Sequence, residues 1–255
     1  GAASLLLLNV AVSWRFGLRL ERRLAIAAMR MVVQLALVGW LLQILFRQDS
    51  PIWTGAMVFV MAAAAGHEVV NRQRRRLAGA APYAVGMGTL LFVGTAFTIV
   101  AVAGLIGAEP WTSPRFFLPV LGMVLGNAMT GVSLVLDAVS WAAERERGSI
   151  EARLALGETR FAAFDSVLRR GLETGLMPIL NAMAVAGVVS LPGMMTGQIL
   201  AGGDPLEAAK YQMLILFVIG AATALSVVLA GFAAVWLLTD ERHRLRLERL
   251  QPERG

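Results

Sequence analysis

Carboxylate, amide, imidazole and thioether groups within apolar stretches of the sequence are the side chains that could bind a cation. Glu68 follows His67 near the end of one such stretch, and its carboxylate could ligate a metal ion or accept a proton. An ionised group at membrane depth costs about 2.5–3.5 kcal/mol, so Glu68 needs an explanation. Because Arg72 lies four residues further on, an ion pair at the membrane edge is the alternative, and we favour it over a metal site.

Two asparagines and several methionines form a second set of candidates. Asn127 lies in the middle of an apolar stretch, where an unpaired amide is costly, and it follows a Gly122-x3-Gly126 spacing that lets two helices approach closely. Its amide could line a cation path or join two helices. Thioethers suit soft cations such as Cu(I), although flexible packing is their commoner role. The candidates for a substrate path are Met123, Asn127, Met129, Asn181, Met194 and Met195.

Motifs for ATP hydrolysis, nucleophilic hydrolysis and thiol chemistry are missing from the sequence. A P-loop needs a lysine followed by serine or threonine, but Lys210, the one lysine, precedes Tyr211. HExxH and nucleophile-elbow motifs are absent, the two histidines are His67 and His243, and there is no cysteine. We therefore expect a chain that is not an enzyme and has no cofactor of its own, so that any ATP-driven work requires another polypeptide.

The composition indicates which elements must position these side chains. Apolar residues make up 57% of the 255 and charged residues 16%, whereas soluble domains have about 45–50% and about 25%. A helix needs about 20 apolar residues to cross the hydrocarbon of a bilayer, and no alternating pattern suggests a barrel. The sequence therefore predicts an all-α integral membrane protein, a single transmembrane domain over residues 1–255. The seven expected spans are 2–14, 24–46, 52–70, 83–107, 116–141, 172–190 and 211–239.

The basic residues alternate between successive loops. Most of them lie in residues 15–30, 72–76, 142–170 and 242–254. By the positive-inside rule, these segments are cytoplasmic, the amino terminus is outside and the carboxyl terminus is in the cytoplasm. This arrangement accounts for the net charge of +6. Because the arginines lack interleaved aromatic residues, we expect no nucleic-acid partner.

The longest hydrophilic stretch, residues 142–170, lies between the fifth and sixth expected spans. Within it, Glu151–Gly157 predicts a short helix closed by a glycine. A second helix should open at Glu158–Thr159, with an amphipathic face formed by Phe161, Phe164, Val167 and Leu168. The pair could form a knob that a soluble partner grips, and the alternative is a solvated amphipathic linker.

The spacing of Glu151, Ala152 and Gly157 resembles the coupling motif of ABC-transporter permeases, written EAA-x3-G. In those permeases the short helix docks into a groove of a cytoplasmic ATPase and transmits its closure to the spans. Arg153 stands where the motif has alanine, and its charged end could extend to the rim of such a groove. The resemblance implies that Glu151, Ala152, Arg153 and Gly157 couple the chain to an ATPase.

Five sequence blocks carry a wider resemblance. They are GMVLGNAM at 122–129, LALG at 154–157, SLPGMMTG at 190–197, AGGDP at 201–205 and KYQ at 210–212. These blocks are similar to the FetB/YbbM family, also called UPF0014, whose members are permeases assigned to iron export and whose plant relatives are linked to aluminium tolerance. The resemblance runs over roughly residues 30–238.

This resemblance implies a permease of the bacterial inner (plasma) membrane, surrounded by lipid. Two copies would assemble with separate cytoplasmic ABC ATP-binding subunits, which hold the ATP and Mg²⁺. Iron as the substrate, and export as the direction, follow from the resemblance alone. A non-metal solute such as a sugar nucleotide, or an ATP-independent carrier or channel, is the alternative.

Prolines and glycines in residues 191–205 predict either an external loop or a re-entrant gate.

Overall fold

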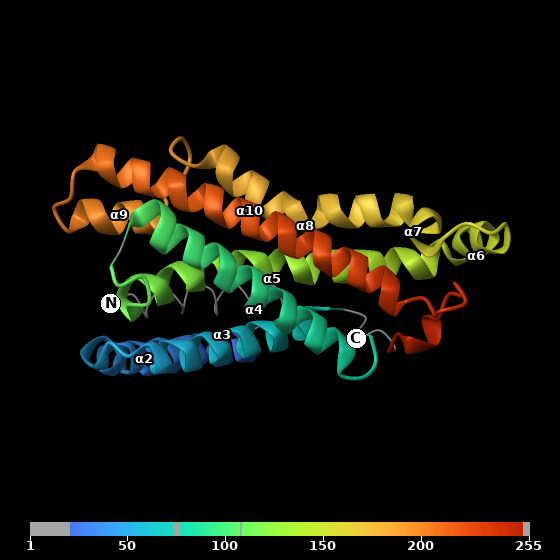
Figure 1. Cartoon of the computed structure of the whole chain (residues 1–255), viewed down its shortest axis with the longest axis horizontal. Helices are drawn as coiled ribbons and strands as arrows, with labels where there is room; N and C mark the ends of the chain where they lie inside the picture. Colours follow the sequence, from blue (N-terminus) through green and yellow to red (C-terminus); the bar gives the residue numbers. More distant parts are fainter. Residues whose placement is uncertain (1–20, 74–76, 108, 252–255) are drawn as a thin grey trace. The chain divides into compact units, whose positions relative to one another are not determined.

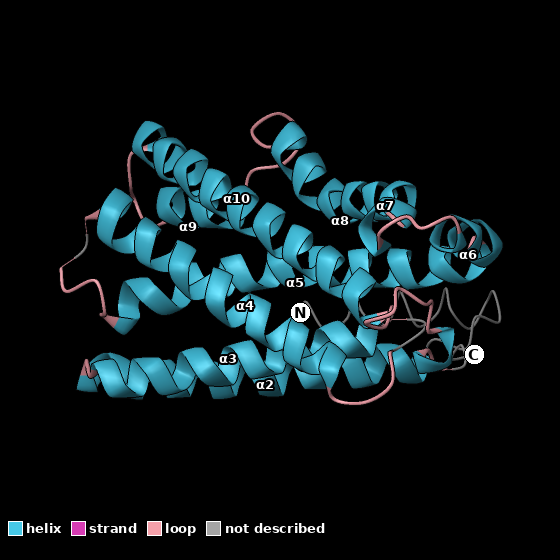
Figure 2. Cartoon of the chain, turned by 45° about the vertical axis from the view of Figure 1, so that its right-hand side comes forward, coloured by secondary structure: helices cyan, strands magenta, loops and turns pink. Residues whose placement is uncertain are grey.

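The computed structural model describes residues 21–73, 77–107 and 109–251, and the ribbon is helical through most of them (Figures 1 and 2). Within these residues, β-structure is limited to isolated bridges. The chain divides into two compact units, residues 1–50 and 51–255. The described part of the first unit is helix α2, Glu21–Gln48, which exposes apolar side chains along most of its length. The span expected at 2–14 lies outside the described residues.

The second unit contains the other long helices. Five described helices, counting α2, are long and apolar enough to cross a membrane, and the expected spans at 24–46, 52–70, 83–107, 116–141 and 211–239 fall on them. The four in the second unit are α3 (Pro51–Arg72), α4 (Ala81–Ile99) continued by the π-helix η1 (Val100–Ile106), α5 (Pro114–Arg145) and α10 (Pro205–Leu237).

The span expected at 172–190 differs from the helix in the structure. Helix α8 is Asp165–Val185, so it starts earlier and takes in charged residues, and it is not among the helices apolar enough to cross a membrane. It ends before a turn in which Gly187 has a φ of +82°, a conformation that favours glycine. After Pro192 the chain forms the short helix α9, Gly193–Leu200. The figure of seven spans is therefore not confirmed.

Helices α8 and α9 together return along α10 (Figure 1). The helical conformation stops between them at residues 186–192, where Val188 and Val189 are 89% and 79% exposed. The block at 191–205 is thus neither a continuous loop nor a straight helix, because α9 forms within it and Pro205 begins α10. A broken helix of this kind is tolerated at membrane depth only where protein or water covers its free backbone groups.

Helix α5 lies at the centre of the second unit and packs against α3, α4, α8 and α10. Val124, Val132 and Val139 on its inner face are fully buried. Gly131 of α5 and Gly175 of α8 let these two helices approach closely. A Cβ built on either glycine would lie 2.8–2.9 Å from the carbonyl oxygen of the other. Small residues therefore determine the separation of the two helices at this point.

Three of the arginine-rich segments meet at one end of the second unit. Leu77 and Leu250 form a β-bridge, and the Ala78 amide donates to the Arg249 carbonyl at 2.6 Å. The amide of Arg160 donates to Nδ1 of His243 at 3.3 Å. The segments after α3, before α8 and after α10 therefore lie together, as the charge pattern requires if they face the same compartment.

Candidate functional site

The motif resembling the coupling sequence forms a short helix and a tight turn. Helix α6 is Arg147–Ala155 and begins four residues before Glu151. After it, the Gly157 amide donates to the Leu154 carbonyl at 3.0 Å, and the Glu158 amide donates to the Arg153 carbonyl at 3.1 Å. This pair of bonds is the Schellman arrangement, and Gly157 takes the required left-handed conformation with φ +89°. The prediction of a helix closed by this glycine is confirmed.

The second helix is shorter than expected. Helix α7 is only Arg160–Ala163, and the chain bends at Phe164 before α8 begins. Thr159 caps α7, because its hydroxyl accepts a hydrogen bond from the Ala162 amide at 3.3 Å. Of the expected apolar face, Phe164 is fully buried, while Phe161 lies 5.3 Å from the ring of Phe232 in α10. The aromatic pair joins the segment to the longest described helix.

Arg153 has a role that the sequence did not indicate. Its Nη2 lies 2.7 Å from Oε2 of Glu158, and its Nη1 donates to the Ala163 carbonyl at 3.4 Å. The guanidinium therefore turns back over the bend and links α6 to α7, instead of extending outward to a rim. Both partners of the ion pair are about one third exposed, so the link holds the geometry of the bend more than it adds stability.

Helix α6 is packed against the bundle on one face and exposed on the other. Ile150 is 2% exposed and fastens the helix to the bundle, whereas Leu156 is 84% exposed at the tip. Ala152 and Ala155 are exposed beside it. Glu151 accepts from Nε of Arg147 at 2.8 Å and is also exposed. A short helix that is fixed by a buried residue, and that exposes a small apolar tip and one carboxylate, can fit into a groove on another protein.

The segment is connected to three long helices, so a force on it can reach all of them. It continues directly from α5 and into α8, and Glu146 forms an ion pair with Arg170 across this corner. Phe161 and Phe232 connect it to α10. In Figure 1, α6 and α7 lie at the same end of the second unit as the tail that follows α10. The coupling role of Glu151, Ala152, Arg153 and Gly157 stays a prediction.

The candidates for the substrate path on α5 lie on two sides of that helix. Nδ2 of Asn127 donates to the carbonyl of Met123 at 2.9 Å, one turn earlier on the same face. Met129 lies about 200° around the helix from Asn127, because successive residues are about 100° apart. Asn127 and Met129 therefore cannot line the same side of one path within a single copy of the chain.

Methionines from three helices pack on one apolar cluster. Met123 of α5, Met183 of α8 and Met194 of α9 contact a buried group that includes Val124, Ile179 and Ile219. The sequence did not show that these thioethers meet, since they come from separate elements. Their packing role is established by this contact, and a role in a path stays a prediction. Met195 is half-buried in α9, and Asn181 is exposed on α8.

Glu68 lies in an ion pair at the end of α3. Its Oε1 is 3.3 Å from Nε of Arg72, and Nη1 of Arg72 also lies 3.4 Å from the hydroxyl of Thr130 on α5. This is the arrangement that we favoured from the sequence. Within the described ranges, no three histidine, aspartate or glutamate side chains converge as a metal site would require.

Comparison with known proteins identifies relatives over almost the whole chain. The profile of a family described as "Uncharacterised protein family (UPF0014)" matches residues 1–237. A UPF0014 membrane protein of Synechocystis is 36% identical over 229 residues, covering 87% of this chain and 86% of the relative.

Two further relatives bear more specific names. "Protein ALUMINUM SENSITIVE 3" of Arabidopsis thaliana is 33% identical over 227 residues, 89% of this chain and 81% of the relative. "Probable iron export permease protein FetB" of Escherichia coli is 30% identical over 250 residues, 98% of this chain and 94% of the relative. No solved structure matches.

Proposed function

Because the chain belongs to the UPF0014 family of membrane proteins, we propose that it is the permease subunit of an ABC transporter that exports iron or another metal ion. The observation that carries the proposal is the bend at Gly157, which holds α6 as an anchored helix with Leu156 exposed at its tip. Iron and the outward direction rest on the similarity to FetB, at 30% identity.

The energy source is a separate subunit in this proposal. The chain lacks a P-loop, so ATP and Mg²⁺ bind to an ABC ATP-binding protein in the cytoplasm. That protein receives α6 in a groove, with Ala152, Ala155 and Leu156 against its surface and Glu151 at the edge. Closure of the ATPase then moves α5, α8 and α10, because the segment is joined to all three.

A second copy of the chain completes the membrane part of the transporter. On α5, the half-exposed Asn127 lies beside Gly126. A Cβ built on Gly126 would meet no atom within 4 Å, so the surface at this glycine is open. A polar amide next to an open glycine surface is costly in lipid and favourable against another helix. We place the second copy on this face, which brings Asn127 and Met123 toward the axis between the copies. The assembly lies in the bacterial inner membrane, with the amino terminus outside.

ATP hydrolysis by the reconstituted complex tests the proposal. We choose Gly157→Val, because a Cβ at this position meets open space and the only penalty is the left-handed backbone. That conformation costs an L-residue roughly 1–2 kcal/mol, which lowers the equilibrium constant for forming the bend about tenfold. Fe(II)-stimulated ATP hydrolysis should fall, by up to the same factor, while membrane insertion is unchanged.

The control is Gly148→Ala, in helix α6, which precedes the bend. A Cβ at Gly148 also meets open space, and its φ is not positive, so stimulation should remain at the wild-type level. Normal stimulation in Gly157→Val would reject the coupling role. A stable complex that no metal stimulates would reject the metal substrate, and stimulation by an organic solute would identify the alternative. Failure of any ABC ATPase to bind the chain would reject the transporter assignment.

A further inference from the structure

The chain after α10 forms a compact hairpin around one carboxylate. A β-bridge joins Thr239 and Leu245. Oδ1 of Asp240 accepts from the amides of Arg242 and Arg244 at 2.9 and 2.8 Å. Its Oδ2 accepts from Nε of Arg244 at 2.8 Å and from Nε of Arg246 at 3.1 Å. Both carboxylate oxygens of Asp240 are thus hydrogen-bonded within the hairpin, and its negative charge is balanced by Arg244 and Arg246.

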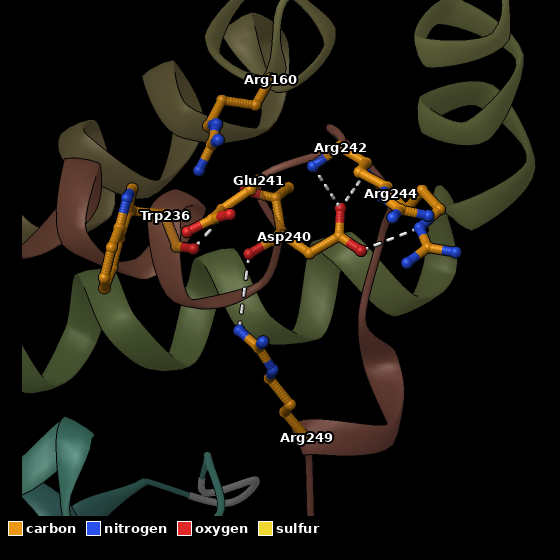
Figure 3. Close-up of a pocket in the computed structure, with 8 residues that line it drawn as sticks. Arg160, Trp236, Asp240, Glu241, Arg242, Arg244 and Arg249 are labelled. Atoms are coloured by element: carbon orange, nitrogen blue, oxygen red, sulfur yellow. Dashed lines mark hydrogen bonds and ion pairs between the residues drawn. The ribbon is translucent and has the colours of Figure 1, made fainter.

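A basic pocket lies between this hairpin, the end of α10 and the start of α7 (Figure 3). Its volume is about 520 Å³, within the range of small-molecule sites. Four arginines and two acids line it, which leaves a positive excess. The lining residues are Arg160, Trp236, Thr239, Asp240, Glu241, Arg242, Arg244 and Arg249.

The arginines of the pocket differ in whether a carboxylate of the chain already neutralises their charge. Arg244 is paired with Asp240 at 2.8 Å. Arg249 donates from Nη1 to the carbonyls of Leu237 and Thr239, at 2.7 and 3.4 Å, which orients its guanidinium without neutralising its charge. In the part of the chain that the structure describes, the guanidinium groups of Arg160 and Arg242 have no carboxylate partner. Three positive charges are therefore available to a ligand.

The position of the pocket restricts what the ligand can be. Trp236 is 62% exposed at the end of the apolar helix α10, and tryptophans at such ends lie at the level of lipid head groups. Guanidinium groups bind phosphate through paired, charge-assisted hydrogen bonds. Glu241 also lines the pocket (Figure 3) and would repel a phosphate, so it limits the affinity.

We propose that this pocket binds a phosphate-bearing anion through Arg160, Arg242 and Arg249. The ligand is the head group of an anionic phospholipid or a free phosphate. Because Arg160 belongs to α7 and Arg242 to the tail, a bound phosphate joins the tail to the helix that follows the bend at Gly157. His243 already touches the same point, since its Nδ1 accepts from the amide of Arg160. The inference does not rest on the transported substrate or on ATP.

Two binding measurements on the full chain separate the sources of phosphate. In detergent, inorganic phosphate is titrated by calorimetry. In nanodiscs of phosphatidylcholine with or without phosphatidylglycerol, the retained lipid is counted by native mass spectrometry. Arg160→Gln and Arg242→Gln should each weaken binding about tenfold, since each removes a charge-assisted contact. Glu241→Gln should strengthen it, because a repulsive charge is removed.

Arg115→Gln is the control, a change of the same charge on an exposed arginine in the first turn of α5. Its binding should equal that of the wild type, and all variants should elute as the wild-type species. Phosphate binding that both pocket variants weaken supports a free anion, and phosphatidylglycerol retention that both weaken supports a head group. Absence of binding in both arms, or binding that neither variant changes, overturns the proposal.

Discussion

Arg153 shows how one side chain can adapt a motif to its surroundings. It replaces the alanine of the coupling pattern and contacts Glu158 and the Ala163 carbonyl. An alanine could make neither contact, so the bend between α6 and α7 would depend on Gly157 and Thr159 alone. The exposed part of the motif, Glu151 and Ala152, is unaffected by this exchange because it lies on the outer side of α6.

Asp240 provides a pH test of the tail. Hydrogen bonding by the Arg244 amide above all, aided by the Arg244 guanidinium, lowers the pKa of Asp240 from 3.8 to about 2. Because the pKa is lower in the folded state, the stabilisation by the ionised carboxylate is complete above pH 3.8 and is lost as the pH falls through about 2. The hairpin should therefore lose amide protection in that interval.

Hydrogen exchange over residues 238–251, corrected for intrinsic rates, measures this loss. Asp240→Asn should show weak protection at every pH, because its amide cannot bind the arginines as an ion. Glu241→Gln, the neighbouring change of the same charge, should retain the wild-type profile. Equal protection of the wild-type tail at pH 5 and pH 2 would contradict the role given to Asp240.

Between elements, the contact of α5 with α8 depends on two glycines. A Cβ at Gly175 would lie 2.9 Å from the Gly131 carbonyl and 2.8 Å from Cγ1 of Val227. Backbone atoms cannot yield as a flexible side chain can, so Gly175→Ala should separate the helices. We expect a loss of about 1–3 kcal/mol of stability, as for other overpacked sites.

Thermal unfolding in detergent provides the measurement. Gly126→Ala is the control, because a Cβ at Gly126 of α5 meets nothing within 4 Å and alanine favours helix. This variant should be at least as stable as the wild type in the isolated chain. If Gly175→Ala unfolds at the same temperature as Gly126→Ala, the close contact in the structure is not a constraint in solution.

For the whole molecule, the grouping of basic segments predicts an orientation in the membrane. Cysteine labelling can test it without a background signal from native cysteines of the chain. The chain has no cysteine, so single cysteines can be introduced directly. In intact cells a membrane-impermeant maleimide should label Glu109→Cys and Ala201→Cys. Ser149→Cys and Glu241→Cys should react only after permeabilisation, because α6 and the tail belong to the arginine-rich end.

All four positions are exposed, so access to the reagent and not burial determines labelling. A complete reversal of the pattern would preserve the fold and contradict the orientation given by the charges. Different results for Ser149→Cys and Glu241→Cys would contradict the structure itself, since the contact of Arg160 with His243 places their segments at the same end.

Composition and local residue patterns were sufficient to predict the membrane class and most of the long helices. They also indicated the helix that Gly157 closes and the side on which the arginines gather. These features depend on residues within a few positions of one another. Apolar run length decides whether a helix can span, and a glycine with positive φ ends a helix wherever it occurs. The ion pair of Glu68 with Arg72 is equally local.

Four features became visible only in the folded chain: the extent of α8, its break before α9, the packing of Met123, Met183 and Met194, and the basic pocket. Local sequence could not separate α8 from a span at 172–190, because its polar first half is stabilised by packing on α5 and α10. The pocket joins Arg160 to Arg242 across 82 positions of the sequence. Such contacts form only when long helices pack, since their free energy comes from surfaces that are distant along the chain and buried together.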